Sequence, residues 1–265
     1  MSEQLIMAVD VGNTNTVVGI FDNTDDLNIQ EHWRTVTIRE RTSDELGIFL
    51  RGFLHSSSIE ARQIKGFIYS SVVPPFNPIV ERMAQDYFYC EPIRIVNDMP
   101  LPIEIVYPRI YEIGADRIVN AVAAHQMFSG DLIVVDMGTA TTFCLIKDGK
   151  YFGGSIAPGL KLSMEALTRN TAQLPTIEFK KPECGVIADS TIHAMQSGFF
   201  FGWTGLLREI MNEIEKEYPG NYKRIATGGL SALIKKERPE LFHVVDPLLT
   251  LKGLKIIYQH QWRKK

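Results

Sequence analysis

The clearest chemical pattern in this sequence is an acid, a glycine and a group of small polar side chains set between two apolar runs. The stretch VDVGNTNTVVGIFD occupies residues 9–22, where Asp10 and Gly12 precede amide and hydroxyl side chains. Backbone N–H groups in such a turn, together with these side chains, can bind phosphate oxygens. The carboxylate of Asp10 can hold hydrated Mg²⁺, because this hard cation takes oxygen ligands and keeps several waters. The stretch is therefore a candidate site for nucleotide phosphates and their metal ion.

A second stretch repeats the pattern near the middle of the chain. In VVDMGTATTFCLIKDG, at residues 134–149, a shift of 126 positions places Asp136 on Asp10 and Gly138 on Gly12. A shift close to half the chain length predicts the duplication of a whole domain, since solenoid repeats have periods of roughly 20–50 residues. Two unrelated hairpin turns are the alternative explanation. The same shift aligns two further pairs, Thr142 with Thr16 and Asp148 with Asp22.

Other nucleotide-binding motifs are missing from the sequence. There is no GxxxxGK[ST], because Gly149 and Lys150 are followed by Tyr151, and no GxGxxG follows a predicted strand. The two acid-glycine turns are therefore predicted to bind a triphosphate from two sides.

A third stretch, EIGADRIVNAVAAHQMF at residues 112–128, begins a predicted helix with Asp116 and Arg117 in its first turn. Asp can simply stabilise a helix N-terminus, and Arg can pair with it. A phosphoryl transfer, however, needs an acid that orients an acceptor hydroxyl and takes its proton, and a nearby Arg offsets developing charge. Spacing alone leaves both interpretations open.

Two glycine-containing stretches have both a structural and a functional interpretation. IATGGL, at residues 225–230, is a strand-to-helix turn in which the backbone can approach a flat or phosphorylated ligand, or simply a turn that needs positive φ. STIHAMQSGFFFGWTGLL, at residues 190–207, has Gly198, Gly202 and Gly205 at helical spacing. It is predicted to be either a close-packing or subunit-contact helix or a buried core helix.

Composition excludes several classes of protein. With 45% hydrophobic and 22% charged residues and a net charge of −3, the chain is typical of globular proteins and lacks a broad cationic surface for nucleic acid. A small basic tail, Arg263 to Lys265, is expected to be a solvated end. No apolar run approaches the roughly 18 residues of a membrane span, and no secretory signal opens the chain, so we expect a cytoplasmic protein.

The cysteines and histidines do not indicate a metal site. Cys90, Cys144 and Cys184 are few and widely spaced, which fits neither a disulfide framework nor a zinc site, and we expect them to be reduced and structural. The six histidines have no HExxH or similar ligand spacing.

Secondary-structure signals place these motifs on a repeated α/β pattern. Each half is expected to begin with three antiparallel strands followed by alternating helices and strands, giving a mixed sheet with flanking helices. A ligand is expected in the cleft between the halves. The stretch at residues 97–113, with three prolines, is predicted to be an extended connection, so the domain boundary is expected near residue 115, with domains at 1–115 and 116–265. The predicted strands are 5–11, 16–22, 30–36, 65–70, 93–96, 132–136, 141–147, 150–156, 223–227 and 242–245; helices are predicted from Ser43, after Pro75, at 159–169 and 190–217, after Gly229 and from Thr250.

These motifs together resemble the type III pantothenate kinases of the acetate and sugar kinase, Hsp70 and actin superfamily. The two acid-glycine turns resemble the superfamily in general, whereas IGADR and AMQSG together are specific to this kinase. The resemblance covers nearly the whole chain in the right order. Its motifs are DVGNTNT (10–16), SSVVP (70–74), IGADRIVNAVAA (113–124), VDMGTATTF (135–143), GGSIAPG (153–159), TAQLP (171–175), AMQSG (194–198), ATGGL (226–230) and LTLKGL (249–254).

The resemblance implies two duplicated ribonuclease H-like (actin-like ATPase) domains and ATP-dependent phosphorylation of pantothenate to 4′-phosphopantothenate. It implies Asp116 as the general base, Asp10 near Mg²⁺, and Asp136 holding a monovalent cation, K⁺ or NH₄⁺. It also implies a homodimer with the pantothenate site built across the subunit interface. The residues implied to contact ATP are Asp10, Val11, Gly12, Asn13, Thr14, Asn15, Thr16, Val17 and Thr139. Those implied to contact pantothenate are Tyr107, Gly114, Ala115, Asp116, Arg117 and Thr191.

Two departures and two alternatives accompany this resemblance. Arg109-Ile110 stands where relatives commonly carry Asn-Pro, and Met137 replaces an aromatic or small residue in the second turn. A kinase for another hydroxylated metabolite would share both turns but differ around Tyr107, Asp116 and Thr191. A regulatory protein that senses ATP would bind nucleotide without turnover, and the presence of Asp116 argues against it.

Overall fold

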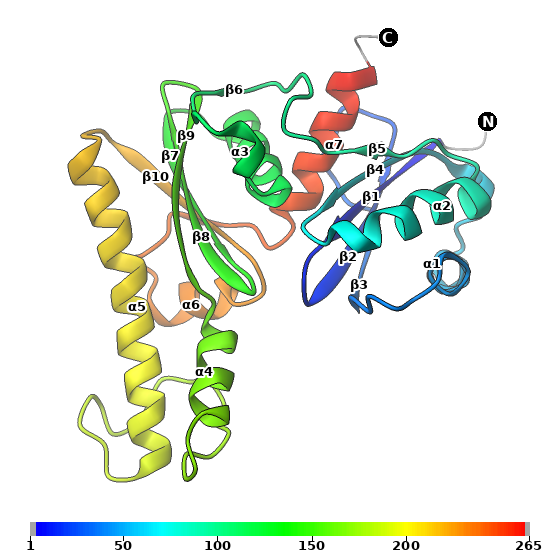
Figure 1. The fold of residues 1–265 in the computed structure, drawn as a ribbon. Coiled ribbons are helices and arrows are strands. Elements are labelled where there is room, and N and C mark those ends of the chain that lie inside the picture. Colours follow the sequence, from blue (N-terminus) through cyan, green and yellow to red (C-terminus); the bar gives the residue numbers. More distant parts are fainter. Residues whose placement is uncertain (1–3, 263–265) are drawn as a thin grey trace. The chain divides into compact units, whose positions relative to one another are not determined.

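Two mixed β-sheets with a common strand order form the framework of the chain (Figure 1). The computed structural model describes residues 4–262. These residues form two compact units, each with its own sheet and helices. The described residues of the first unit lie within Met1–Glu104, Pro108–Met127 and Leu249–Lys265, and the second unit comprises Ile105–Tyr107 and Phe128–Leu248.

The first unit contains a five-stranded sheet in the order β3-β2-β1-β4-β5. Strand β1 pairs with β2 in antiparallel and with β4 in parallel orientation. Helices α1 and α2 share a hydrophobic core with alternate residues of β1, whereas α3 packs against α7, which also contacts β1. The strand bounds are β1 Leu5–Val11, β2 Asn15–Asp22, β3 Glu31–Val36, β4 Ile64–Ser71 and β5 Ile93–Arg94; the helix bounds are α1 Ser43–Ser56, α2 Asn77–Phe88, α3 Ala115–Met127 and α7 Leu249–Trp262.

Strand β1 has consecutive buried apolar residues rather than an alternating pattern, because both of its faces are covered. On one face of the first unit, Leu5, Met7 and Val9 enter the core shared with α1 and α2. Helix α1 begins after Thr42, whose side chain accepts a hydrogen bond from the Glu45 backbone in a capping box. Local sequence and core packing therefore agree on where these elements lie.

The second unit is built around a six-stranded sheet in the order β11-β10-β7-β8-β9-β6. Helices α4, α5 and α6 supply side chains to its hydrophobic core, which includes Leu160, Trp203 and Ile234. The strand bounds are β6 Glu104–Ile105, β7 Asp131–Met137, β8 Ala140–Lys147, β9 Lys150–Pro158, β10 Tyr222–Thr227 and β11 Val244–Val245; the helix bounds are α4 Leu160–Arg169, α5 Thr191–Glu217 and α6 Ser231–Glu237. Short 3₁₀ turns lie at Ala61–Gln63, Pro74–Phe76 and Ile110–Glu112.

The two sheets repeat the same arrangement, with one difference inside the second turn. Strand β7 follows β1 by 126 positions, whereas β8 follows β2 by 125 and has the same burial pattern. Val11 pairs with Thr16 across the first turn, and Met137 pairs with Thr141 across the second. The second turn is therefore one residue shorter, and Thr141, rather than Thr142, occupies the position of Thr16.

The two-sheet α/β architecture predicted from the sequence is confirmed, with one addition. Strand β6, within the stretch expected to be an extended connection, joins the edge of the second sheet. The domain boundary near residue 115 stays a prediction about the duplication, since the compact units also assign α3 and α7 to the first unit. The basic tail lies outside the described residues.

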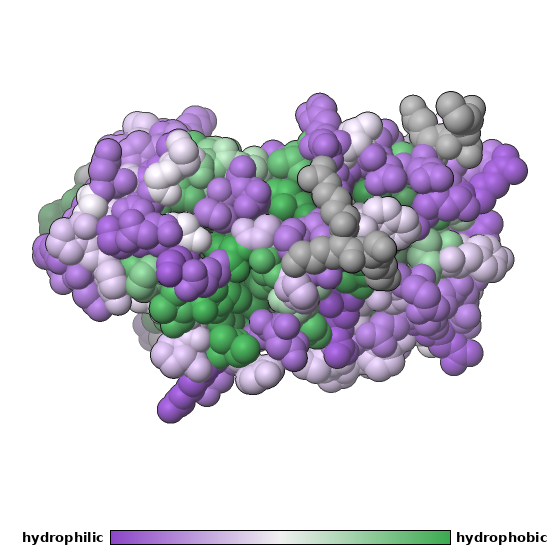
Figure 2. All heavy atoms as spheres, turned by 90° about the horizontal axis from the view of Figure 1, so that it is seen from above, coloured by the Kyte–Doolittle hydropathy of each residue, from purple (hydrophilic) through white to green (hydrophobic). Residues whose placement is uncertain are grey.

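The surface and helices of residues 4–262 add two observations. None of these helices combines the length and hydropathy needed to cross a membrane. On the face drawn in Figure 2, polar and charged side chains surround an apolar area. An exposed apolar area of this kind is typical of a surface that binds a partner or ligand.

Candidate active site

The first acid-glycine turn, between β1 and β2, is held by hydrogen bonds to its own backbone and to the end of β3. The Gly12 amide donates to the Asn15 carbonyl at 3.0 Å, and the Thr37 amide donates to the Thr14 carbonyl at 3.0 Å. The Thr37 hydroxyl donates to the Gly12 carbonyl at 2.8 Å and lies 2.9 Å from the Thr16 hydroxyl. The turn therefore has a fixed backbone, as a preorganised phosphate site requires.

Asp10 lies one residue before the end of β1, where its carboxylate is oriented by the neighbouring strand. Asp10 is opposite Ser70 of β4 in the parallel register, and the Ser70 hydroxyl donates to Asp10 Oδ1 at 2.7 Å. Ser70 is buried. Ligands of open α/β sheets bind beyond the carboxyl ends of parallel strands, which is where Asp10 lies. An oriented carboxylate there fits a hydrated Mg²⁺, which needs oxygen ligands.

A cationic side chain also reaches the first turn. Arg39, beyond β3, donates from Nη2 to Asn13 Oδ1 at 3.3 Å. Neither Arg39 nor Thr37 is predicted as a site residue from the sequence, although both follow β3 closely. Their role depends on the chain returning to the β1–β2 turn, which the linear sequence does not specify.

Asp116 is the second residue of α3, and its carboxylate lies close to Gly114, just before the helix. Its Oδ1 accepts a hydrogen bond from the Arg117 backbone at 2.8 Å. A Cβ atom added to Gly114 would lie 2.6 Å from the same oxygen and 3.9 Å from Val72. Val72 directly follows β4, the strand whose Ser70 contacts Asp10. The first unit therefore brings the turn before α3 to the same end of the sheet as the first acid-glycine turn.

The environment of Asp116 suits a proton acceptor. Burial raises the pKa of its carboxyl above the usual range, and the backbone N–H and the charge of Arg117 only partly oppose this rise. A carboxylate with a raised pKa accepts a proton more readily than an ordinary exposed one. Arg117 is almost fully buried beside it, at 6% exposed, so its packing keeps a positive charge close to this acid.

The second acid-glycine turn, between β7 and β8, is closed like the first. It is covered by the turn Gly228-Gly229-Leu230, the GGL turn. The Gly138 amide donates to the Ala140 carbonyl at 3.0 Å. A Cβ atom added to Gly228 would lie 2.7 Å from both Asp136 Oδ1 and the Met137 backbone, and Gly228 has φ +88°. The carboxylate of Asp136 thus lies close to the backbone of the Gly228 turn, and its oxygen is a ligand of the kind that a hard cation takes.

Thr139, in the same turn, is held by the end of the GGSIAPG stretch. The Gly159 amide donates to the Thr139 carbonyl at 3.1 Å. A Cβ atom added to Gly159 would lie 2.3 Å from that carbonyl oxygen and 2.4 Å from the carbonyl oxygen of Gly138. Glycine is needed here because the two backbones approach so closely.

Tyr107 packs against the glycine of another strand in the second unit. Val106 donates a backbone hydrogen bond to the Tyr151 carbonyl at 2.9 Å, which brings the chain alongside β9. A Cβ atom added to Gly153 would lie 2.6 Å from the Tyr107 ring. The glycines of GGSIAPG therefore make room for Tyr107 as well as for the second turn.

Within the second unit, Thr191 lies away from Tyr107. It is exposed and is the first residue of α5, after the N-cap residue Ser190. In Figure 1 the first turn of α5 lies at the lower end of that helix, whereas β6, just before Tyr107, lies at the upper edge of the sheet. The structure therefore does not bring Thr191 and Tyr107 together within one chain.

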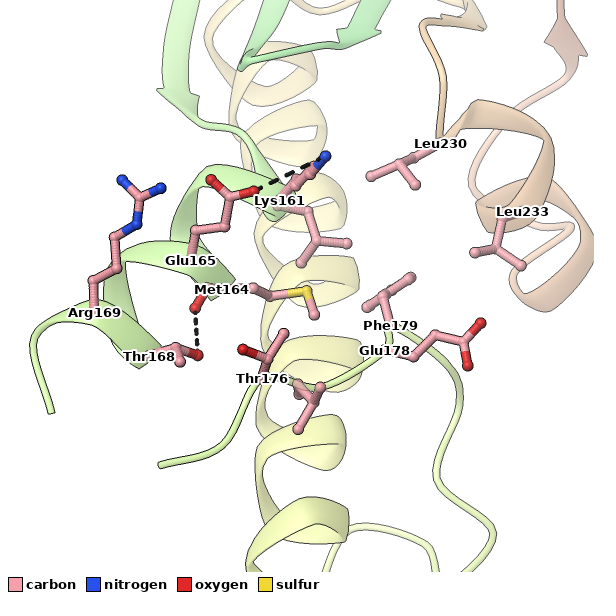
Figure 3. Close-up of a pocket in the computed structure, with 12 residues that line it drawn as sticks. Lys161, Met164, Glu165, Thr168, Arg169, Thr176, Glu178, Phe179, Leu230 and Leu233 are labelled. Atoms are coloured by element: carbon pink, nitrogen blue, oxygen red, sulfur yellow. Dashed lines mark hydrogen bonds and ion pairs between the residues drawn. The ribbon is translucent and has the colours of Figure 1, made fainter. Parts of the chain in front are cut away.

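A pocket of about 540 Å³ adjoins the GGL turn of the second unit. Figure 3 shows Met164 of α4 and Leu230 and Leu233, at the start of α6, pointing toward the same space. Lys161 and Glu165 form an ion pair of 3.9 Å at its rim. An apolar interior with a charged rim is typical of a site for a flat organic ligand.

The structure shows what surrounds the two departures from the family pattern, Arg109-Ile110 and Met137. The Asn97 amide donates to the carbonyls of Ile110 and Ile113, the latter at 2.7 Å, and Arg109 pairs with Glu112 at 3.3 Å. The loop that follows Tyr107 is thus anchored without the Asn-Pro pair. Met137 is buried in the second core, as expected for a side chain directed away from the ligand.

Comparisons with known proteins give one consistent result. The family model described as type III pantothenate kinase matches residues 6–213. The type III pantothenate kinase of Geobacillus kaustophilus (strain HTA426) is 42% identical over 262 residues, which cover 98% of this chain and 100% of that protein.

Solved structures of similar fold are much less similar in sequence. One is the inorganic polyphosphate/ATP-glucomannokinase of Arthrobacter sp. strain KM, with a TM-score of 0.51, 14% identity, and 97% of this chain and 99% of that chain covered. Another is the activator of the 2-hydroxyisocaproyl-CoA dehydratase from Clostridium difficile, with a TM-score of 0.56, 10% identity, and 98% and 96% covered. At these identities the likeness concerns the fold alone, and it confirms the actin-like ATPase architecture expected from the sequence.

Proposed function

This chain belongs to the type III pantothenate kinase family, and from this premise we propose how its residues divide the work of phosphorylating pantothenate. The reaction transfers the γ-phosphoryl group of ATP to the pantothenate hydroxyl, giving 4′-phosphopantothenate and ADP in the first step of coenzyme A biosynthesis. The near-complete match to a kinase of this family carries the assignment of the reaction. The residue roles below are our proposals.

Asp116 is the general base in this proposal. Its carboxylate takes the proton of the pantothenate hydroxyl while the hydroxyl oxygen forms a bond to the γ-phosphorus. The bond between the γ-phosphorus and its bridging oxygen breaks in line, and ADP leaves. The raised pKa of Asp116 supports this role, and the Arg117 charge offsets the negative charge that develops.

The two acid-glycine turns bind the triphosphate. Residues 10–17 and Thr139 contact its phosphates. Mg²⁺, when bound with ATP, neutralises charge on the β- and γ-phosphates, and Asp10 would hold this ion through water. The hydrogen bond from Ser70 supports this role because it orients the Asp10 carboxylate. Arg39 adds a positive charge beside the first turn.

Asp136 holds the monovalent cation, K⁺ or NH₄⁺. Support comes from the close packing of the Gly228 backbone against its carboxylate, which leaves no room for a side chain. The pocket beside Leu230 and Leu233 is proposed to hold the adenine ring, because it is apolar and lies next to this turn.

Pantothenate contacts Tyr107, the segment from Gly114 to Arg117, and Thr191. Within one chain Thr191 lies at the far end of α5 from the Tyr107 side of the sheet, so a site that uses both needs a second copy of the chain (Figure 1). This separation supports a homodimer with the site across its interface. Exposed apolar residues near the start of α5, Ile187 at 86% and Ile192 at 48%, provide surface for such a contact. We expect the reaction to take place in the cytoplasm.

The decisive experiment measures ADP release from ATP and pantothenate, with K⁺ or Na⁺ as the only monovalent cation. Wild type should turn over only with pantothenate and faster in K⁺, whereas folded Asp116→Asn should lose nearly all turnover. ATP binding without pantothenate-dependent turnover in any cation would contradict the assignment. If Asp116→Asn turned over at close to the wild-type rate, only the proposed role of Asp116 as general base would be contradicted.

A further inference from the structure

Three side chains with different metal-binding chemistry converge before and within the first turn of α5. A ligand atom from each of Cys184, Asp189 and His193 lies within 4.8 Å of the other two. Among residues 4–262 this is the one place where three such groups meet. The spacing Cys-x₄-Asp-x₃-His does not match a common zinc signature, which is why the sequence alone did not indicate it.

The segment that carries Cys184 is anchored to α5 rather than merely lying on the surface. The hydroxyl of Ser197, a buried residue, donates to the Val186 carbonyl at 2.7 Å. The Gln196 amide, also buried, donates to the Glu178 carbonyl at 3.2 Å. Gly185, next to Cys184, has φ +82°, a conformation that favours glycine and turns the chain back toward the helix.

The other two side chains are held at the helix start. The Ser190 side chain caps α5 by accepting from the His193 backbone at 3.3 Å. Asp189 Oδ1 lies 2.7 Å from Nδ1 of His193. The cap fixes the backbone of Asp189 and His193 on one side of the first turn, facing the anchored segment. A preorganised backbone lowers the entropy cost of gathering the three ligands.

We propose that Cys184, Asp189 and His193 form a binding site for a divalent transition-metal ion of the Zn²⁺ class. A thiolate, an imidazole and a carboxylate are the ligands that Zn²⁺ takes in proteins, and a site with three protein ligands keeps water in its fourth position. Bond lengths of about 2.0–2.3 Å place tetrahedral ligands roughly 3.4–3.6 Å apart. The three ligand atoms, all within 4.8 Å of one another, are near this spacing, and the side chains of Cys184 and Asp189 are exposed. Mg²⁺ is not expected to compete, because it prefers oxygen ligands alone.

The first test is metal binding by the purified full-length protein after treatment with a chelator. Calorimetric titration with Zn²⁺ should give one ion per chain, and Co²⁺ should give a thiolate charge-transfer band. Cys184→Ser and His193→Ala should each weaken Zn²⁺ binding at least tenfold, while the matched surface variants Glu183→Gln and His55→Ala bind like wild type. Absence of saturable binding, or wild-type affinity in Cys184→Ser, would overturn the proposal.

The second test uses the exposure of Cys184, since Cys90 and Cys144 are buried. Alkylation of the one reactive thiol in the folded protein should slow at least tenfold when Zn²⁺ saturates the site. His193→Ala, folded as judged by circular dichroism, should lose this protection. Alkylation that is equally fast with and without saturating Zn²⁺ would show that any bound ion lies elsewhere and would overturn the proposal.

Discussion

Ser70 and Asp10 face each other across the parallel pair β1 and β4, and the Ser70 hydroxyl donates to the Asp10 carboxylate at 2.7 Å. The two residues are 60 positions apart in sequence, yet the sheet places them side by side. This contact orients the acid that we propose to hold Mg²⁺ beside the first turn. The equivalent position in the second sheet pairs Asp136 with Thr227.

Replacing Ser70 by alanine should therefore weaken use of MgATP without unfolding the chain. A lost hydrogen bond of about 0.5–1.5 kcal/mol corresponds to roughly a two- to twelvefold loss in kcat/KM for MgATP. Steady-state kinetics with each substrate varied in turn would measure it. Ser71→Ala is the matched control, because the Ser71 hydroxyl contacts Val73 instead and the variant should keep wild-type kinetics. Equal losses in the two variants would contradict a specific role for Ser70.

Asp116→Asn should lower kcat by roughly 10²- to 10⁴-fold, because asparagine keeps the shape of the side chain but cannot accept the proton. In wild type, kcat should fall as the pH drops through the pKa of Asp116, which burial raises above its usual range. The acid limb of the pH–rate profile should thus lie above 3.8, the pKa of an ordinary aspartate side chain. A profile that stays flat down to that value would argue against Asp116 as the base.

The same raised pKa makes a separate prediction about stability. The folded state holds the Asp116 proton more tightly than the unfolded state, so its contribution to the free energy of unfolding falls as the pH rises from 3.8 through the folded pKa. The cost is fully present above the folded pKa, so Asp116→Asn should raise Tm there, with a gain that shrinks toward acidic pH. Thermal unfolding measured at several pH values would test this.

Asp131→Asn is the control, because its effect on Tm should have the opposite sign. Burial raises the pKa of Asp131, but hydrogen bonds from the Asp148 backbone at 2.9 Å and from Lys147 at 3.0 Å outweigh it and hold the pKa below the usual range. Its stabilisation is present at neutral pH and is lost as the pH falls through the folded pKa. This variant should therefore lower Tm at neutral pH. Shifts of the same sign in both variants would contradict the argument.

Local sequence patterns predict the two turns and the main elements better than the contacts that support them. The two turns, the order of strands and helices along the chain, and the helix whose first turn contains Asp116 all follow from local patterns that the sequence displays directly. Ser70, Thr37 and Arg39 were not predicted as site residues, because each reaches its turn only through strand pairing or a returning loop. The one-residue difference between the turns was also hidden, since a fixed shift aligns both sequences equally well on the acid and the glycine.

Arg39→Gln should raise the KM for ATP several-fold while leaving the KM for pantothenate nearly unchanged. The guanidinium donates to Asn13 in the first turn, where it would attract phosphate. The effect should diminish at high ionic strength, since salt screens exposed charges. Arg62→Gln is a suitable control because Arg62 is exposed and pairs with Glu60, outside the first turn. An unchanged KM for ATP at low salt would contradict this role.

Gly228→Ala should lose both stability and activation by K⁺. The added Cβ atom would lie 2.7 Å from Asp136 Oδ1, and alanine would have to adopt φ +88°. A strained backbone of this kind costs about 1–3 kcal/mol. Gly198→Ala in α5 is the control, because its Cβ atom meets nothing within 4 Å and alanine favours a helix. Denaturant unfolding and the ratio of rates in K⁺ and Na⁺ would measure the two effects, and equal stability of the variants would refute the strain argument.

Lys255 tests whether a buried charge or a buried volume matters more in the first unit. Its side chain is fully buried, and its ammonium donates to the Asp22 carbonyl and lies 5.4 Å from the centre of the Phe21 ring. Lys255→Ala should cost about 2–5 kcal/mol, because it leaves a cavity. Lys255→Met fills most of that volume and should cost less than about 1.5 kcal/mol. Denaturant unfolding of the two variants should separate the cost of the cavity from the cost of losing the ammonium and its hydrogen bond. Equal losses of stability in the two variants would mean that the hydrogen bond to Asp22 dominates.

The pH dependence of Lys255 provides the final check. Burial lowers its pKa, while the Asp22, Asp25 and Asp26 charges oppose that shift. The unfolded state therefore binds this proton more tightly, so the free energy of unfolding rises with pH between the folded pKa and 10.5. Because Lys255→Met removes the group, the stability of wild type relative to this variant should increase with pH across that window. A difference that stays constant or decreases would mean that the ammonium is not destabilised by burial.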